Sequence, residues 1–194
     1  MITLLKKCQE TLKSKILQHF LGVFRFKNLT EFKMINNGFK KSLAKLKRSF
    51  YRNCEVFTYG ILNRPVWEIK PKSCNSDLLI LFLHGGAYIA NMTKMRWNLA
   101  EKLLIKTCAI VIVPDYPLAP ENAWKDTYAF LDELYLSLLR RYSKKIVFIG
   151  DSAGGELALG FAQKLKNEKR RLPDHIVLFS SSVLYIVILK NYVQ

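Results

Sequence analysis

Ser152 is the residue of this chain whose type and surroundings most directly suggest chemistry. It stands in the segment GDSAG at 150–154, with a glycine two residues before it and another two residues after it. A serine hydroxyl is a weak nucleophile at neutral pH, so it acts in catalysis only beside a base that a third group orients. The pattern G-x-S-x-G between a strand and a helix is typical of a nucleophile elbow. It also fits a serine that caps a helix after a glycine turn, and the pattern alone does not separate the two.

A second segment, HGGAY at 84–88, offers hydrogen-bond donors to a negatively charged oxygen. Gly85 and Gly86 leave their backbone N–H groups open to close approach, and the N–H of Ala153 would be a third donor. Glycines after a strand can equally form an ordinary turn, with His84 as a structural histidine. Because a candidate nucleophile follows later in the chain, we favour an oxyanion hole made of Gly85, Gly86 and Ala153.

Two acidic residues lie in the proline-rich segment PDYPLAPENAW at 114–124. Its prolines and the end of a strand force a defined loop here rather than a helix. Asp115 and Glu121 could serve as catalytic carboxylates, but acidic side chains in such loops more often hydrogen-bond the backbone. We expect both residues to fix the loop.

The elements that would position these residues alternate between short apolar runs and amphipathic stretches, which is the signature of a parallel sheet with connecting helices. The run at 77–86 is apolar almost throughout and ends in glycines, as a strand buried on both faces should. Leu99, Leu103 and Leu104 share one face of the next predicted helix. The pattern predicts strands at 66–70, 77–86, 109–116, 145–150 and 175–180, the first of them at an edge of the sheet, and helices at 96–107, 124–142 and 152–166.

Length and charge indicate one globular, basic domain. The chain has 194 residues, enough for one α/β domain with a proper core, and a net charge of +16. Residues 1–53 hold 13 of the 31 basic residues and only two acids. Apolar residues recur there at helical spacing with lysines between them, which predicts an amphipathic helix; they are Leu5, Cys8, Leu12, Ile16 and Phe20. We favour a helical cap with solvated lysines. Weak contact with an anionic membrane surface is the alternative, and a nucleic-acid-binding arm has no motif behind it.

The cysteines and the apolar runs indicate in which cellular compartment we expect the protein. The cysteines are scattered, with no C-x-x-C pair and no histidine at ligand spacing, so we expect free thiols in a reducing cytoplasm and no metal site. The first residues carry lysines at positions 6 and 7 and lack the apolar core of a signal peptide. The run at 183–189 is too short to span a bilayer. The four cysteines are Cys8, Cys54, Cys74 and Cys108.

Three segments together resemble a known family. HGGAY, DYPLAPE and GDSAGG, in this order, resemble the oxyanion motif, the D-Y-x-L-A-P-E loop and the nucleophile elbow of the hormone-sensitive-lipase-like branch of the α/β-hydrolase superfamily. The resemblance covers roughly residues 60–180. It implies an α/β-hydrolase fold, with a mostly parallel sheet, helices on both faces and an amino-terminal helical cap. It also implies hydrolysis of small carboxylic esters, acetyl esters among them, without metal or cofactor.

The resemblance also implies roles for individual residues. Ser152 looks like the nucleophile. The residues expected around it are Gly85, Gly86 and Ala153 in the oxyanion hole, with His84 and Asp151 in support. One departure is Ala87, where many members of the family have a third glycine. We expect this change to affect the shape of the acyl pocket more than the chemistry.

The catalytic base is the missing part. In this superfamily an acid and then a histidine follow the serine along the chain. Behind Ser152 the only acids are Glu156, Glu168 and Asp174, and the only histidine is His175. The glutamates fall in the predicted helix or at its end, while Asp174 and His175 are adjacent at the start of the last strand. We therefore expect none of them to form a triad with Ser152.

The last residues depart from the family. Beyond residue 180 the chain reads SSVLYIVILKNYVQ, where the family continues with a turn of proline, aromatic and acidic residues. We therefore expect an esterase that is incomplete at its carboxyl end through a frameshift or a truncated gene, with a cap segment at 1–53, a partial core at 54–180 and a divergent tail at 181–194. Ester hydrolysis through an acyl-Ser152 intermediate would then be impaired. The alternatives are an inactive gene fragment and a non-catalytic module that binds acyl esters or other small molecules, since plant gibberellin receptors resemble this family without a working triad.

Overall fold

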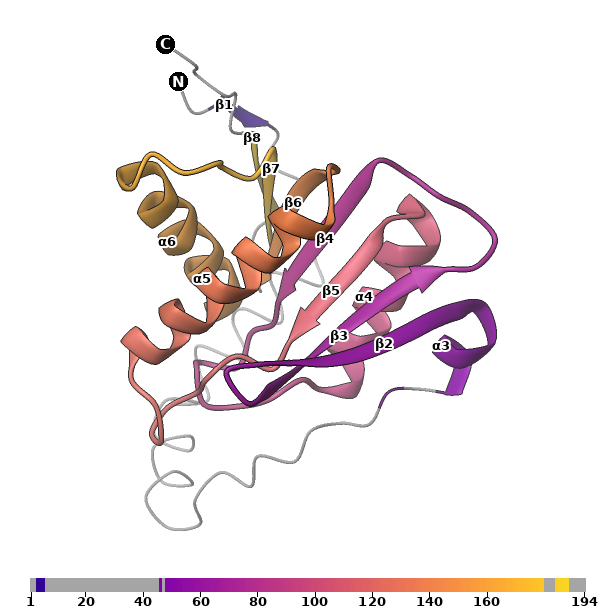
Figure 1. Cartoon of the computed structure of the whole chain (residues 1–194), viewed down its shortest axis with the longest axis horizontal. Helices are drawn as coiled ribbons and strands as arrows, with labels where there is room; N and C mark the ends of the chain where they lie inside the picture. The colour runs from indigo at the N-terminus through magenta and orange to yellow at the C-terminus, as the bar shows by residue number, and fades with distance from the viewer. Residues whose placement is uncertain (1–2, 6–45, 47, 180–183, 189–194) are drawn as a thin grey trace, which may run out of the picture.

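The computed structural model of the chain describes residues 3–5, 46, 48–179 and 184–188. In this part the strands form one sheet in the order β1-β8-β7-β6-β4-β5-β3-β2, with helices packed on both of its faces (Figure 1). The strands are β1 Thr3–Leu5, β2 Cys54–Ile61, β3 Arg64–Pro71, β4 Leu78–Leu83, β5 Ile110–Pro114, β6 Lys145–Asp151, β7 His175–Phe179 and β8 Leu184–Ile188. The helices are α3 Arg48–Asn53, α4 Lys94–Thr107, α5 Trp124–Arg141 and α6 Ala153–Asn167.

The centre of the sheet is the parallel part that the alternation of elements predicted. β5, β4, β6 and β7 run parallel to one another. Along β4, Leu79, Leu81 and Leu83 join the core on the side of α5 and α6, while Ile80 and Phe82 join the core on the side of α4. Both faces of β4 are therefore buried. This explains its unbroken apolar sequence and confirms the expectation of a strand buried on both faces.

The strand predicted at 66–70 exists as β3, but its expected place at the sheet edge was wrong. β3 pairs antiparallel with β5 on one side and with β2 on the other, so β2 forms the edge. Leu62 and Asn63 connect β2 to β3 with φ values of 45° and 61°, and positive φ at both positions is what a two-residue hairpin of type I′ requires. Leu-Asn is not one of the usual pairs for this turn, so the sequence lacked the signal that would have predicted β2.

The helices follow the predicted ranges closely, but the buried face of α4 differs from the prediction. Leu104 is buried as expected, whereas Leu99 and Leu103 are only partly buried. Trp97 and Ala100 lie fully in the core instead. The large indole of Trp97 takes the central place against the sheet, and the leucines pack at its margin.

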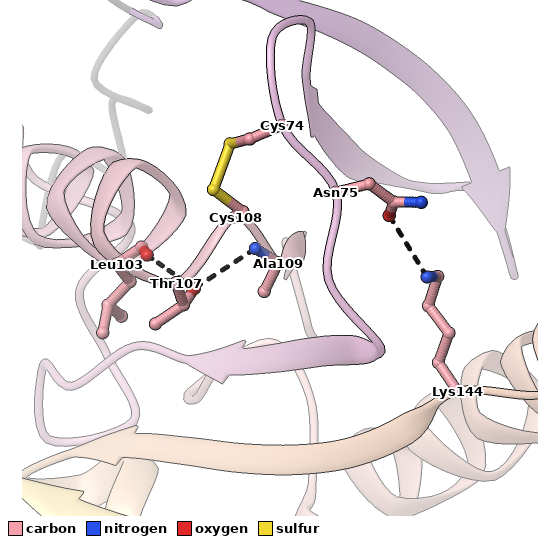
Figure 2. The surroundings of a disulfide bond; sticks show 7 residues. All are labelled: Cys74, Asn75, Leu103, Thr107, Cys108, Ala109 and Lys144. Carbon is pink, nitrogen blue, oxygen red and sulfur yellow. Dashed lines mark hydrogen bonds between the residues drawn. A yellow bond between two sulfur atoms is a disulfide. The ribbon is translucent and has the colours of Figure 1, made fainter.

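Cys74 and Cys108 form a disulfide, so the expectation of free thiols was wrong for this pair (Figure 2). Cys74 lies between β3 and β4, Cys108 lies between α4 and β5, and their Cα atoms are 5.5 Å apart. The two residues are 34 positions apart in the chain, and only the pairing of the strands brings them together. Cys54 is a free thiol whose pKa is raised by burial, and Cys8 lies outside the described residues. The expectation of a reducing compartment rested on free thiols, so the disulfide removes that support.

The backbone around Cys108 is held by local hydrogen bonds. Cys108 has a left-handed φ of 52°, and its N–H donates to Leu104 O at 2.9 Å, which caps the end of α4. The hydroxyl of Thr107 donates to Leu103 O at 2.7 Å and accepts from Ala109 N at 3.2 Å (Figure 2). These bonds fix the turn from which Cys108 reaches Cys74.

The described ends of the chain are strands. β1 pairs with β8 and β8 pairs with β7, both antiparallel. Leu5, the first residue of the helix predicted in the basic segment, belongs to β1, while the rest of that predicted helix lies outside the described residues. Within the described ranges, none of the helices combines the length and the apolar character needed to cross a bilayer.

Candidate active site

Ser152 occupies the sharp turn between β6 and α6. Its φ of 52° and ψ of −119° lie in a region that residues with a side chain rarely adopt. The backbone N–H of Ser152 donates to Phe179 O at 2.7 Å, and its C=O accepts from Gly155 N at 2.8 Å. Although Ser152 is the N-cap residue of α6, its hydroxyl makes no capping hydrogen bond, and the residue is exposed. This geometry favours a nucleophile elbow over a serine that caps a helix.

Close contacts explain two glycines of the elbow. A Cβ on Gly150 would overlap Gly154 O and Gly155 Cα, and a Cβ on Gly154 would overlap Leu83 O. Gly155 has more room, because its Cβ would lie 3.4 Å from Leu178 Cδ2. The ends of β4 and β6 can therefore approach the start of α6 this closely only with glycine at positions 150 and 154.

The glycine turn after β4 lies against the elbow. A Cβ on Gly85 would stand 2.5 Å from Asp151 O and 2.9 Å from Asp151 Oδ2. Ala153 is the first residue of α6, where backbone N–H groups and the helix dipole favour negative charge. Because β4 and β6 are parallel neighbours, the structure brings Gly85, Gly86 and Ala153 to the same end of the sheet as Ser152.

The HGGAY turn has a left-handed backbone at consecutive residues. The φ values are 125° at Gly86, 51° at Ala87 and 60° at Tyr88. Gly86 O closes the turn by accepting from Ile89 N at 3.0 Å and Ala90 N at 2.9 Å. Such φ values favour glycine, so the departure from the family at Ala87 falls on a residue whose backbone a glycine would adopt without strain.

His84 packs against the glycine turn. It is fully buried, its ring is stacked on Tyr116 with centroids 4.5 Å apart, and its Nδ1 lies 2.7 Å from Gly85 O. A carbonyl oxygen can only accept, so Nδ1 carries the proton and donates this bond. Burial lowers the pKa of His84 to about 4, which keeps the ring neutral at pH 7. In the part of the chain that the structure describes, the buried Nε2 has no hydrogen-bond partner.

Asp151 is tied to α4 through Arg96. Arg96 Nε donates to Asp151 Oδ2 at 2.8 Å, and the two side chains are 14% and 22% exposed. A Cβ on Gly85 would also lie 3.2 Å from Arg96 Nη2, so the guanidinium lies under both the elbow and the glycine turn. Sequence reasoning missed Arg96, because nothing in its spacing connects it to residues 150–154.

Asp115 holds the loop after β5 against the start of β3, and the described partner of its carboxylate is a side chain, whereas a backbone group was expected. Its carboxylate accepts from Arg64 Nη2 at 3.0 Å, and its backbone N–H donates to Pro65 O at 3.0 Å. Further along the same loop, Ala119 N donates to Tyr88 O at 2.8 Å. The proline-rich loop is thereby hydrogen-bonded to the HGGAY turn.

The acidic residues and the histidine near the end of the sequence do not gather at Ser152. His175 is the first residue of β7 and pairs with Val147, near the start of β6. Ser152 follows the last residue of β6, so about 13 Å along the strand separates the position of His175 from the elbow. The carboxylate of Asp174 accepts from Ile146 N at 2.8 Å, at the same far end. Glu168 follows the last turn of α6. Asp174 and His175 therefore lie at the end of the sheet opposite to Ser152.

A cavity of about 700 Å³ opens beside the elbow, between α5, α6 and the proline-rich loop. Among its lining residues, Tyr88 is the last residue of HGGAY, and Glu156 lies in the first turn of α6. Tyr88 Oη donates to Glu156 Oε2 at 3.2 Å. Sequence reasoning missed this cavity because its walls come from separate helices. Its described lining also includes Ala119, Ala123, Trp124, Tyr128, Leu157 and Lys164.

A profile of the α/β-hydrolase fold matches residues 80–189 of the chain. The matched region contains the glycine turn, the proline-rich loop and the elbow. It continues past residue 180, beyond the range over which the motifs carry the resemblance, and includes β8.

Individual proteins match over part of their length. The chain is 33% identical over 115 residues to an esterase of Acinetobacter venetianus, a match that covers 58% of this chain and 38% of that protein. It is 37% identical over 89 residues to esterase LipU of Mycobacterium tuberculosis, covering 45% of this chain and 30% of that one. A solved esterase from the bacterial hormone-sensitive lipase family superposes with a TM-score of 0.57 and 25% identity, over 70% of this chain and 45% of the other. The matches span less than half the length of each of these proteins.

Proposed function

Because the chain belongs to the hormone-sensitive-lipase-like family of α/β-hydrolases, we propose that it hydrolyses small carboxylic esters with Ser152 as the nucleophile. The observation that carries this proposal is the conformation of Ser152, an exposed residue in a left-handed turn at the start of α6. A serine held at such a turn has its hydroxyl free for attack, while the N–H groups of the helix start favour the negative charge that forms.

In the proposed reaction, Ser152 Oγ attacks the carbonyl carbon of the ester and its proton passes to a base. The carbonyl oxygen becomes negatively charged and accepts hydrogen bonds from the N–H groups of Gly85, Gly86 and Ala153, each of which contributes about 3–4 kcal/mol. The bond to the alcohol then breaks, and the alcohol leaves with a proton. Water attacks the acyl-Ser152 intermediate, releases the carboxylic acid and restores the hydroxyl.

The source of the base limits the expected rate. Among the described residues the two imidazoles are His84, which is buried and donates to Gly85 O, and His175, which lies at the other end of the sheet. With these residues alone Ser152 lacks a positioned base, so we expect its acylation to be about a thousandfold or more slower than with an intact triad. This is the impaired esterase that the motifs predict.

Hydrolysis of p-nitrophenyl acetate tests the proposal. Ser152→Ala should remove the rate above background that the protein causes. Ser143→Ala is the matched control, because Ser143 is an exposed serine at the other end of the sheet and its replacement should leave the rate unchanged. A rate that survives Ser152→Ala would overturn the assignment of the nucleophile.

A covalent probe gives a readout that does not depend on turnover. Paraoxon transfers its diethylphosphoryl group to an activated serine and loses p-nitrophenolate, so the protein gains one diethylphosphoryl mass. We expect peptide mass spectrometry to place that mass on Ser152 in the unmodified chain and to find none in Ser152→Ala. Labelling of other serines at the same rate would show that Ser152 is not activated.

A non-catalytic binding module is the second candidate, and the distance between His175 and Ser152 favours it. In this case the chain binds acyl esters but neither hydrolyses them nor reacts with paraoxon. Equilibrium binding of an ester that remains intact on prolonged incubation would support the module over the enzyme.

Weak membrane-surface contact through residues 1–53 stays a prediction, since most of that segment lies outside the described residues. Sedimentation of the full chain with anionic liposomes and with neutral liposomes tests it. Equal sedimentation with both would count against a contact driven by the basic residues.

A further inference from the structure

A second cleft, of about 750 Å³, lies between the β2–β3 hairpin and the end of α5. Its described lining includes no residue of the HGGAY turn, the proline-rich loop or the elbow, so it is separate from the candidate active site. Phe57 and Tyr59 contribute from β2, Glu68 and Lys70 contribute from β3, and Arg141 is the last residue of α5. The volume lies within the range of small-molecule sites.

Glu68 is a buried carboxylate in this lining, and both of its oxygens are occupied. It is 2% exposed. Its Oε1 accepts from Lys70 Nζ at 2.9 Å and from the hydroxyl of Tyr142, and its Oε2 accepts from Arg141 Nη1 at 2.7 Å. Burial alone would raise the pKa of Glu68, but the hydrogen bonds and cations around the carboxylate outweigh burial and lower the pKa. Glu68 is therefore negatively charged at pH 7.

The cations in the cleft exceed this one negative charge. Lys70 and Arg141 both pair with Glu68, and the described lining contains no other acidic residue. The side chains of Lys70 and Arg141 are 33% and 37% exposed, so a dissolved molecule can reach them. The cluster therefore has one positive charge more than Glu68 balances, and it attracts anions.

The same cluster has hydrogen-bond donors to spare. A guanidinium has several N–H donors and cannot accept. Arg141 Nη2 donates to Tyr59 Oη at 2.5 Å. Burial raises the pKa of Tyr59 to about 12, so the phenol keeps its own proton at pH 7, and no acceptor for that proton lies among the described residues. An anionic oxygen beside Arg141 and Tyr59 would accept from both.

Aromatic rings lie beside the two cations. Lys70 Nζ is 4.8 Å from the ring centroid of Phe57, and Arg141 Cζ is 4.5 Å from that of Tyr59. Phe57 is 47% exposed, so much of its surface remains open to the ring of another molecule. Aromatic rings pack on one another in offset or edge-to-face arrangements. A planar ring next to an anionic group therefore matches both features of the cleft.

From the excess of positive charge, the spare donors and the exposed ring of Phe57, we propose that this cleft is a second ligand site, which binds a small aromatic molecule that carries a carboxylate. The carboxylate accepts from Arg141 and Tyr59, and the ring of the ligand packs on Phe57. The planar guanidinium suits a carboxylate, because the two can form parallel hydrogen bonds. Binding in this cleft does not require Ser152 to react.

Isothermal titration calorimetry of the full chain with 2-naphthoate tests the ligand class. 2-Naphthamide has the same ring without the charge, and acetate has the charge without the ring. We expect 2-naphthoate to bind at least tenfold more tightly than either compound. An affinity for 2-naphthamide or for acetate equal to that for 2-naphthoate would overturn the proposal.

A matched pair of variants locates the ligand. Arg140 and Arg141 are neighbouring, exposed residues at the end of α5, but only Arg141 lines the cleft. Replacement by glutamine removes the same charge in both. Arg141→Gln should weaken binding of 2-naphthoate at least tenfold, whereas Arg140→Gln should change it less than twofold. If the two variants bind 2-naphthoate alike, the ligand does not lie in this cleft.

A second pair leaves the charged cluster intact, since Arg141→Gln also removes a partner of the buried Glu68. Ser137 lines the cleft from α5, while Ala129 is an exposed residue of the same helix outside this cleft. Ser137→Leu should weaken binding of 2-naphthoate at least fivefold by filling the cleft, and Ala129→Leu should leave it unchanged. Far-UV circular dichroism checks that both variants keep their helices. Equal binding by the two variants would contradict the proposed site.

The variant Ser152→Ala separates this site from the proposed active site. We expect it to lose ester hydrolysis and to bind 2-naphthoate with the affinity of the unmodified chain. If Ser152→Ala lost binding as well, the ligand would lie at the elbow and the second site would be wrong. If hydrolysis survived in Ser152→Ala while binding followed the Arg141 and Ser137 variants as described, the proposed nucleophile would fail and the second site would hold.

Discussion

Arg96 donates from Nε to Oδ2 of Asp151 at 2.8 Å, so a residue in the first turn of α4 is bound to the residue that precedes Ser152. The pair is largely shielded from solvent, and it also lies against Gly85. The elbow and the glycine turn therefore share one support, which comes from the opposite face of the sheet to α5 and α6.

Arg96→Gln should lower the free energy of unfolding by about 1–3 kcal/mol, because it removes a charge-assisted hydrogen bond and leaves Asp151 without this partner. Urea denaturation measures the change. Lys102→Gln, an exposed change on the same helix, should stay within about 0.5 kcal/mol of the unmodified chain. If Arg96→Gln were as stable as Lys102→Gln, the ion pair would not stabilise the fold.

Ala87→Gly should stabilise the chain by up to about 1 kcal/mol. The φ of 51° at this residue costs alanine about 1–2 kcal/mol, and the greater freedom of glycine in the unfolded chain offsets part of the gain. Ala90→Gly serves as the control, since Ala90 has no positive φ and the same change there should destabilise. Urea midpoints that fall by the same amount in both variants would mean that Ala87 is not strained.

Cys74→Ala should lower stability by about 2–4 kcal/mol, because it opens the loop that the disulfide closes. Thermal unfolding with and without dithiothreitol measures the effect. The unmodified chain should lose stability on reduction, and the variant should be insensitive to the reductant. An unmodified chain that melts at the same temperature in both buffers would contradict a stabilising bond between Cys74 and Cys108.

The free energy of unfolding should decrease as the pH falls below about 6.5, the pKa of a free histidine, because His84 is buried in its neutral form. Its pKa is about 4 in the folded chain and about 6.5 in the unfolded chain, so the unfolded state binds more protons between these values. The contribution is complete above pH 6.5 and is lost toward pH 4, with about 1–2 kcal/mol lost between pH 7 and pH 5.

Urea midpoints at pH 7 and pH 5 test this pH dependence. His84→Asn keeps a donor for Gly85 O but does not titrate, so it should flatten the dependence. Equal slopes in the unmodified chain and His84→Asn would show that another group causes the loss.

The sequence predicted the parts of the fold in which the local pattern and the tertiary environment agree. The strand β4 and the glycines at 150 and 154 are examples. Burial on both faces requires an unbroken apolar sequence, and close backbone contact requires glycine, so both features can be recognised in the sequence. β2, the disulfide between Cys74 and Cys108, and the position of Arg96 depend on which distant segments meet. That information is absent from local spacing, so these features required the structure.

The hydrogen bond from Ser152 N to Phe179 O has a consequence for the order in which the site forms during protein synthesis. The ribosome adds the motif at 150–154 well before it adds β7, so a nascent chain that ends before Phe179 has the serine but not the bond that holds its amide. This hydrogen bond can form only after β7 has been made and has paired with β6. The amide of Ser152 thus gains its partner later than the motif itself is made, although that motif is among the easiest to recognise.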